Sequence, residues 1–224
     1  MPALLRQLGP RLPLLTGGAR DLPRRQQTMR DTIAWSYDLL APSVQALFRR
    51  ISVFVGGFGL DGAEAIRDRV MAASGIPPPG PPLEVVDGIT ALIEQSLLLR
   101  TTGPGDEPRY RMLETVREFG LDRLRASGEE REVRAAHAAY VQTVADLVPE
   151  RLFSPEFERV VARLDADHDN VRAALAWAAA ADEPEVGLRL AGAMIYYWLV
   201  RGGYREGHRH LARALARATR TPSP

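Results

Sequence analysis

The chain has 224 residues, 46% of them hydrophobic, which is enough for one large or two small domains with a buried core. A formal net charge of +1 gives no overall attraction to nucleic acid or acidic membranes. Cysteine and lysine are both absent, which excludes disulfides, thiol nucleophiles, Schiff-base lysines and a P-loop lysine. The longest apolar cluster, residues 191–200, is too short to span a bilayer, and the first residues lack the apolar run of a signal peptide. We therefore expect a cytoplasmic protein that does not enter a membrane.

The spacing of hydrophobic residues predicts four helices and a β-hairpin in the first half of the chain. Thr28, with Asp31 three residues later, is typical of a helix start, and Pro42 suits the first turn of a second helix. Gly56 and Gly57 are expected to end that second helix, and the proline-rich segment 75–82 cannot be helical. Helices followed by a hairpin, in the order helix, helix, helix and hairpin, are typical of a winged helix. The predicted helices cover about 28–40, 42–55, 60–73 and 85–93, and the predicted strands cover about 96–101 and 110–113.

The second half of the chain is predicted to be entirely helical. Residues 202–215 resemble the turn and second helix of a tetratricopeptide repeat, with Tyr204 and Leu211 at packing positions. We expect a mainly α fold. It consists of a tail or linker over 1–27, a winged-helix domain with a small β-hairpin over 28–127, and a tetratricopeptide-like repeat array over 128–224 that stops inside the array. After Glu114 a helix is expected with Val116, Phe119, Leu121 and Leu124 on or near one face, and further helices are expected over about 133–148, 156–181, 185–200 and 204–218.

Five segments match a known family in their combination. The segments are RQQTMRDTIAWSYDLL (25–40), LFRRISVF (47–54), LIEQSL (92–97), YRMLETVREF (110–119) and DHDNVRAAL (167–175). Together they resemble the large actinobacterial transcriptional regulators of the LuxR and antibiotic-regulatory (SARP, AfsR-like) kind, whose central ATPase belongs to the STAND class. In that family a P-loop nucleotide domain comes first, a winged helix packs over the nucleotide, and a tetratricopeptide-like array follows. No Gly-x-x-x-x-Gly-Lys-Ser/Thr motif occurs here, so we expect the nucleotide domain to lie outside this chain.

The resemblance also places a degenerate nucleotide sensor in the chain. The family's Met-His-Asp motif, whose histidine contacts the β-phosphate of ADP, corresponds to Met112, Leu113 and Glu114. Leucine cannot donate a hydrogen bond to phosphate, which argues against direct ADP sensing here. Glu114 still suits the start of the helix that it begins. We expect no cofactor in this chain, because ATP or ADP would need the P-loop domain.

A winged helix also suggests DNA binding through the helix before the hairpin. That helix carries Glu84, Asp87 and Glu94 and no basic residue between positions 82 and 99, so phosphates would repel it. We therefore expect intramolecular or protein contacts, with DNA bound only in a full-length context. The candidate DNA-backbone contacts are Arg100, Arg109 and Arg111 on the hairpin.

The expected partners are a nucleotide-binding domain, in cis or in trans, and a protein bound by the helical array. A stand-alone DNA-binding winged-helix protein and a helical interaction adaptor are the alternatives. No catalytic constellation is present, so we expect no enzyme. By analogy with helical repeats, the candidate partner-binding residues are Tyr197, Arg201, Tyr204, Arg205 and His208.

Two further motifs are rejected from the sequence. Residues 57–62 match Gly-x-Gly-x-x-Gly, but the proline-rich segment occupies the place of the second strand that a dinucleotide fold needs. Residues 165–170 imitate the start of an EF-hand, but Asn170 and Ala176 replace the required glycine and glutamate. We interpret the acidic residues there as a solvated N-terminal helix turn, and we expect no metal site.

Overall fold

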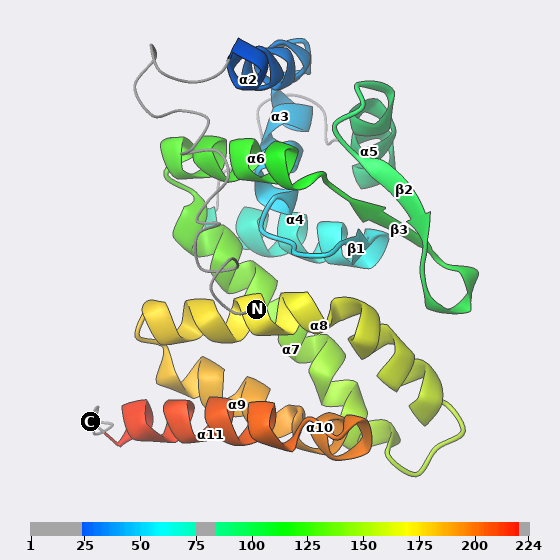
Figure 1. The fold of residues 1–224 in the computed structure, drawn as a ribbon, viewed down its shortest axis with the longest axis vertical. Coiled ribbons are helices and arrows are strands. Elements are labelled where there is room, and N and C mark those ends of the chain that lie inside the picture. The colour runs from blue at the N-terminus through cyan, green and yellow to red at the C-terminus, as the bar shows by residue number, and fades with distance from the viewer. Residues whose placement is uncertain (1–23, 75–83, 220–224) are drawn as a thin grey trace.

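A computed structural model of the protein describes residues 24–74 and 84–219 (Figure 1). The described part is mainly α-helical and contains one three-stranded antiparallel sheet, which confirms the expected fold class. The predicted proline-rich loop and most of the predicted N-terminal tail lie outside the described residues. Among the described helices, none combines the length and the apolar character that crossing a bilayer requires.

The first half of the described chain has the arrangement of a winged helix. Strand β3 lies in the middle of the sheet, between β1 and β2, and pairs Tyr110 with Phe58 and Arg109 with Thr101. The elements in order are α2 (Arg24–Asp38), α3 (Pro42–Ile51), β1 (Phe58–Gly59), α4 (Leu60–Ser74), α5 (Val85–Glu94), β2 (Leu99–Thr102), the 3-10 helix η2 (Pro104–Asp106), β3 (Pro108–Arg111) and α6 (Glu114–Ser127).

Several boundaries differ from the sequence expectation, and three of them have a physical reason. Helix α2 begins at Arg24, so Thr28 lies inside the helix and does not cap it. Helix α3 ends at Ile51. Val55, whose spacing from Ile51 suggested a longer helix, lies in the turn before β1, where its N–H binds Asn170. Strand β2 begins at Leu99 and is exposed, because the apolar residues that suggested a buried strand enter the core in the preceding turn.

The second half consists of long helices that pack side by side (Figure 1). Helix α7 runs from the winged helix into this part, where it packs on α8, and α9 packs on α11. The helix expected over 185–200 is broken at Met194, which ends α9 and precedes α10. The elements are α7 (Glu130–Arg151), α8 (Phe157–Ala180), α9 (Pro184–Ala193), α10 (Ile195–Arg201) and α11 (Tyr204–Ala218).

One apolar core continues through both halves. Inside the winged helix, the rings of Tyr37, Phe48 and Phe119 lie 5.4–6.3 Å apart by their centroids. At the border, Phe54 stacks on Phe58 at 4.7 Å and meets Tyr140 of α7 edge to face. Aromatic pairs of this kind add to the stabilisation from burial alone. The winged helix is therefore packed against the helices that follow it.

Candidate functional site

The wing strand β3 is joined to helix α8 by a buried ion pair. The Nη2 atom of Arg109 donates to Asp167 Oδ1 at 2.7 Å, to the carbonyl of Gly57 at 3.1 Å and to the carbonyl of Ala166 at 3.2 Å. The two charged side chains are 12% and 4% exposed. A charge buried this deeply is stable in the fold only while its partner remains in place. Strand β3 and helix α8 are therefore held in one relative position.

Asn170, one turn further along α8, binds the turn that precedes β1. It is fully buried. Its Nδ2 donates to the carbonyl of Gly57 at 2.8 Å, and its Oδ1 accepts the backbone N–H of Val55 at 2.7 Å. Its Nδ2 also lies 3.1 Å from Asp167 Oδ1, which links the amide to the ion pair. We call these four residues with Arg109, namely Val55, Gly57, Asp167 and Asn170, the junction.

The turn of the junction depends on glycine. Gly57 has φ +124°, which side chains rarely adopt, and a Cβ there would lie 2.9 Å from the carbonyl oxygen of Tyr110. Gly56 also has a positive φ, +79°. The two glycines let the backbone turn sharply beside β3 and present its N–H and C=O groups to α8. The two glycines thus allow the turn, and the side chain of Asn170 binds its backbone groups.

A second polar contact lies beside the junction. Asp61 in the first turn of α4, Tyr140 of α7 and Arg163 of α8 meet there. Arg163 pairs with Asp61 and donates to Tyr140 Oη at 3.1 Å, and Tyr140 Oη lies 3.3 Å from Asp61 Oδ2. Burial, together with the nearby carboxylate of Asp61, raises the pKa of Tyr140, so the phenol stays protonated and can donate. Three helices are tied together at this point.

A neutral histidine completes the buried polar group. His137 of α7 is buried, its Nε2 lies 3.4 Å from Asn170 Oδ1, and its ring meets Phe54 edge to face at 5.0 Å. Burial lowers the pKa of His137 to about 4. The imidazole is therefore uncharged near pH 7 and does not disturb the neighbouring ion pair. The group links three segments that are distant in the sequence and has no arrangement for nucleophilic or acid–base catalysis.

Residues 165–170 lie in the middle of α8, so our interpretation of them as an N-terminal helix turn is wrong. Asp167 and Asn170 face the wing from one side of the helix. Among residues 24–74 and 84–219, no group of three or more His, Cys, Asp or Glu side chains is placed to hold a metal ion. The roles of these two residues were not predicted from the sequence. No signal in the sequence singles them out, because most residues of the segment 163–172 are polar and surround them on the helix.

The degenerate sensor residues lie where β3 passes into α6. Leu113 is the N-cap residue of α6, makes no side-chain cap hydrogen bond and is 48% exposed. Glu114 lies in the first turn, and its two carboxylate oxygens accept from Arg117 at 2.8 and 3.1 Å. Met112 is partly buried, with its sulfur 3.6 Å from Ser52 Oγ. An exposed leucine therefore stands at the position that the resemblance assigns to the phosphate-sensing histidine.

The three wing arginines do not share one environment. Arg100 and Arg111 are exposed on the hairpin. Arg109 points inward to Asp167, so grouping it with the surface contacts to a DNA backbone was wrong. Arg109 and Arg111 lie two positions apart and share one side of β3, so alternation does not separate them. They differ because Asp167 of α8 lies within reach of Arg109.

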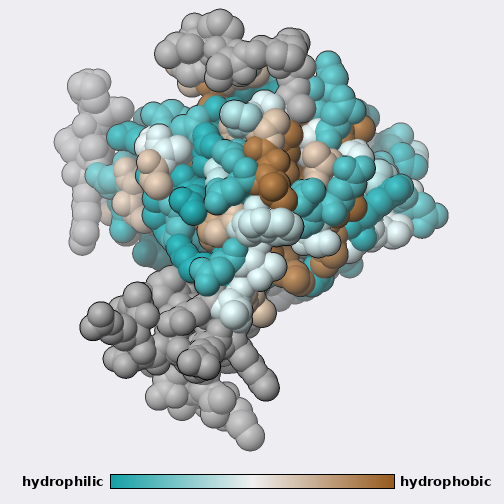
Figure 2. Space-filling view, turned by 90° about the horizontal axis from the view of Figure 1, so that it is seen from above, coloured by the Kyte–Doolittle hydropathy of each residue, from teal (hydrophilic) through white to brown (hydrophobic). Residues whose placement is uncertain are grey.

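The exposed surface of the winged helix is acidic and partly apolar around α5. Glu84, Asp87 and Glu94 are exposed, and Val86 is 52% exposed on the same helix. Seen from the side of α2, hydrophobic residues form a band between hydrophilic ones (Figure 2). On α2 itself, Trp35 is 66% exposed. Exposed apolar groups beside acidic ones suit a protein contact better than a phosphate backbone.

The five candidate partner residues of the helical part fall into two groups. Tyr197 is 3% exposed and donates from its hydroxyl to Asp165 Oδ1 at 2.9 Å, and Arg201 pairs with the same carboxylate. These two residues therefore attach α10 to α8. Tyr197 is buried and does not belong to a free surface, whereas Arg201 remains exposed beside Asp165. Tyr204, Arg205 and His208 are also exposed.

Comparison with known proteins agrees with this architecture. Residues 40–125 match the family described as winged helix-turn-helix domain, so the chain contains such a domain. The chain is homologous to a provisionally named HTH-type transcriptional regulator of Mycobacterium tuberculosis and to its counterpart in Mycobacterium bovis. Each is 39% identical over 197 residues, which cover 87% of this chain and 21% of the relative. An uncharacterized protein of Mycobacterium tuberculosis is 32% identical over 139 residues, or 62% of this chain and 33% of that protein. No solved structure matches. The chain thus spans about a fifth of the length of the first of these relatives.

Proposed function

We propose that this chain is the regulatory part of a STAND-type transcriptional regulator of the LuxR and SARP kind, in which the winged helix relays the state of a nucleotide-binding domain to the helical array. In this proposal residues 28–127 form the winged-helix unit and residues 128–224 a tetratricopeptide-like array that receives a protein or ligand signal in the cytoplasm. The nucleotide domain acts in cis or in trans. The homology to regulators of which the matching segment covers only 21% supports a role as one part of a larger protein.

The observation that carries the proposal is the junction. A relay needs a rigid connection between the element that senses one state and the element that reports it. The ion pair between Arg109 and Asp167 and the two hydrogen bonds of Asn170 to backbone provide such a connection. A displacement of the wing must therefore either move α8 or break a buried ion pair.

A deletion in the full-length Mycobacterium tuberculosis relative tests the relay. We expect removal of the region aligned with residues 128–224 to change its rate of ATP hydrolysis or its oligomeric state. The measurements are a phosphate-release assay and light scattering of the purified proteins. If both quantities stay at the values of the intact protein, the relay proposal is refuted.

The second candidate function is direct DNA binding by the winged helix, which the family match and the name of the relatives favour. The acidic surface of α5 opposes it. Fluorescence anisotropy with duplex DNA at 50 and 200 mM salt separates the two functions. We expect only weak binding, in the non-specific range of about 10⁻⁴–10⁻⁶ M. Nanomolar binding that Arg100→Gln and Arg111→Gln abolish would instead establish the DNA-binding function.

A further inference from the structure

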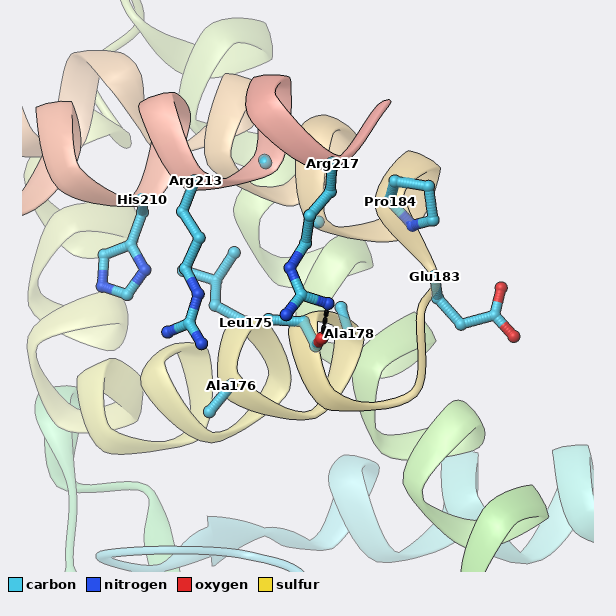
Figure 3. A pocket seen from close by; sticks show the side chains of 11 residues that line it. Leu175, Ala176, Ala178, Glu183, Pro184, His210, Arg213 and Arg217 are labelled. Carbon is cyan, nitrogen blue, oxygen red and sulfur yellow. Dashed lines mark hydrogen bonds between the residues drawn. The ribbon is translucent and has the colours of Figure 1, made fainter. Parts of the chain in front are cut away.

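A small pocket lies between the end of α8, the start of α9 and helix α11 (Figure 3). Its volume is about 60 Å³. Alanine and glycine residues form much of its wall, which keeps the backbones close and the pocket shallow. Three basic side chains, His210, Arg213 and Arg217, extend from α11 toward α8 across the pocket (Figure 3). None of the residues that line it belongs to the junction.

The three basic side chains differ in how far they are already engaged. Arg217 donates to the carbonyl of Ala179 and lies 3.9 Å from the exposed carboxylate of Asp182, so it is anchored at one end of the pocket. Arg213 makes no hydrogen bond or ion pair with any residue in 24–74 or 84–219. His210 stacks against Trp198, with 6.0 Å between the ring centroids and 7° between the planes. The pocket therefore offers one free guanidinium, one anchored guanidinium and a fixed imidazole.

The groups that would repel an anion are turned away or already bonded. The carboxylate of Glu183 points away from the pocket (Figure 3), and Arg131 lies 3.3 Å from it. The carbonyl of Ala178 accepts the backbone N–H of Glu183 at 2.9 Å, and the carbonyl of Ala179 accepts from Arg217. The first turn of α9 also borders the pocket, and the partial positive charge of a helix N-terminus attracts anions.

We propose that this pocket binds an oxyanion, the phosphate or carboxylate group of a small-molecule effector. The volume of about 60 Å³ exceeds the space that one water molecule needs, so the pocket has room for one such group. A guanidinium presents paired N–H groups that match the oxygens of phosphate and carboxylate. The apolar wall of alanines lowers the local dielectric and strengthens these contacts.

Titration of the whole chain with inorganic phosphate and with acetate tests the site. Sodium chloride holds the ionic strength constant, and backbone ¹⁵N chemical shifts and the melting temperature are recorded. We expect at least one of the two anions to shift the amide signals of residues around the pocket and to raise the melting temperature. The anion that does so distinguishes phosphate from carboxylate chemistry. If neither acts more strongly than chloride, the proposal is overturned.

Matched variants locate the binding. Arg213→Gln removes the free guanidinium and should weaken binding about tenfold or more, as expected for a lost charged hydrogen bond. Arg209→Gln removes the same charge from an exposed position of the same helix that does not line the pocket, and should leave the affinity within about twofold. Equal weakening in both variants would show general charge attraction and overturn the site.

A third variant closes the pocket without changing its charge. A methyl group on Gly187 would lie 3.8 Å from the Cβ atoms of Ala178 and Ala214, which is ordinary contact distance. Gly187→Ala should therefore fold normally, since alanine is also the better helix former. It should reduce binding because the methyl group occupies part of the 60 Å³. Unchanged affinity in Gly187→Ala would place the anion elsewhere and contradict the proposal.

Discussion

Replacing Arg109 with methionine should separate the wing from helix α8. The variant keeps the aliphatic stem of the side chain but removes the guanidinium that binds Asp167. Breaking a buried ion pair from one side costs about 3–5 kcal/mol, because the remaining charge stays buried without its partner. Asp167 would retain the 3.1 Å contact from Asn170, and Arg163 Nε lies 4.0 Å from its other oxygen. We therefore expect a loss of about 3 kcal/mol in the free energy of unfolding.

A double-mutant cycle with Asp167→Leu measures the interaction itself. With both charges gone, no buried charge is left unpaired, so the double variant should be more stable than the sum of the single losses predicts, by about 2 kcal/mol. Urea unfolding followed by circular dichroism gives the free energies, and hydrogen exchange of the β2–β3 hairpin reports its detachment. The exposed Arg111→Met is the control and should change stability by less than about 0.5 kcal/mol. An Arg109→Met loss equal to that of the control, or strict additivity in the cycle, would refute the view that the pair fixes the wing.

Three further predictions concern the surrounding core. Asn170→Ala should cost about 3 kcal/mol in urea unfolding, because the N–H of Val55 loses its buried acceptor. Gly120→Ala should be strongly destabilising, since a Cβ there would lie 1.9 Å from the hydroxyl of buried Ser52. In the control Gly192→Ala the new methyl group meets nothing within 4 Å, so this variant should be neutral or slightly stabilising. Similar melting temperatures for the two variants would contradict the packing of α6 on α3. Burial lowers the pKa of His137 to about 4, so its contribution to stability is complete above pH 6.5 and is lost as the pH falls toward 4. Between pH 7 and pH 5 the natural protein should lose about 2 kcal/mol more than His137→Phe, and parallel pH profiles would disprove this.

The two sides of the winged helix differ in their surroundings, because one is buried at the junction and the other exposes the acidic surface of α5. The side that carries β1 and β3 is occupied by α8 within the same chain. The side of α5 is exposed, with Val86 between acidic residues. Arg109, which by sequence belonged with the DNA-facing arginines, is therefore a structural residue of the connection. This leaves Arg100 and Arg111 as the wing arginines exposed to a ligand.

The periodicity of the sequence was sufficient for most helices, because a helix is determined by residues three and four positions apart. Helix α11 begins at Tyr204 and ends at Ala218, as predicted, and α4 begins at Leu60 as predicted. The order of three helices and a hairpin also followed from the chain, and with it the winged-helix domain. One error came from Val55, which lies four residues after Ile51 and so fits a helix by its spacing, although the helix ends at Ile51.

The contacts that join the two halves followed from the tertiary structure alone. Strand β1 has only two residues and is defined by its pairing with β3. A segment this short has no periodic pattern from which a strand could be predicted. Asp167 finds its cation 58 residues earlier in the chain, and Asn170 finds its backbone partners 113 and 115 residues earlier. A sequence shows which side chains are polar and where glycine permits a sharp turn. The tertiary structure determines which of these side chains are buried together away from water. There, a charged carboxylate without its arginine would strongly destabilise the folded state.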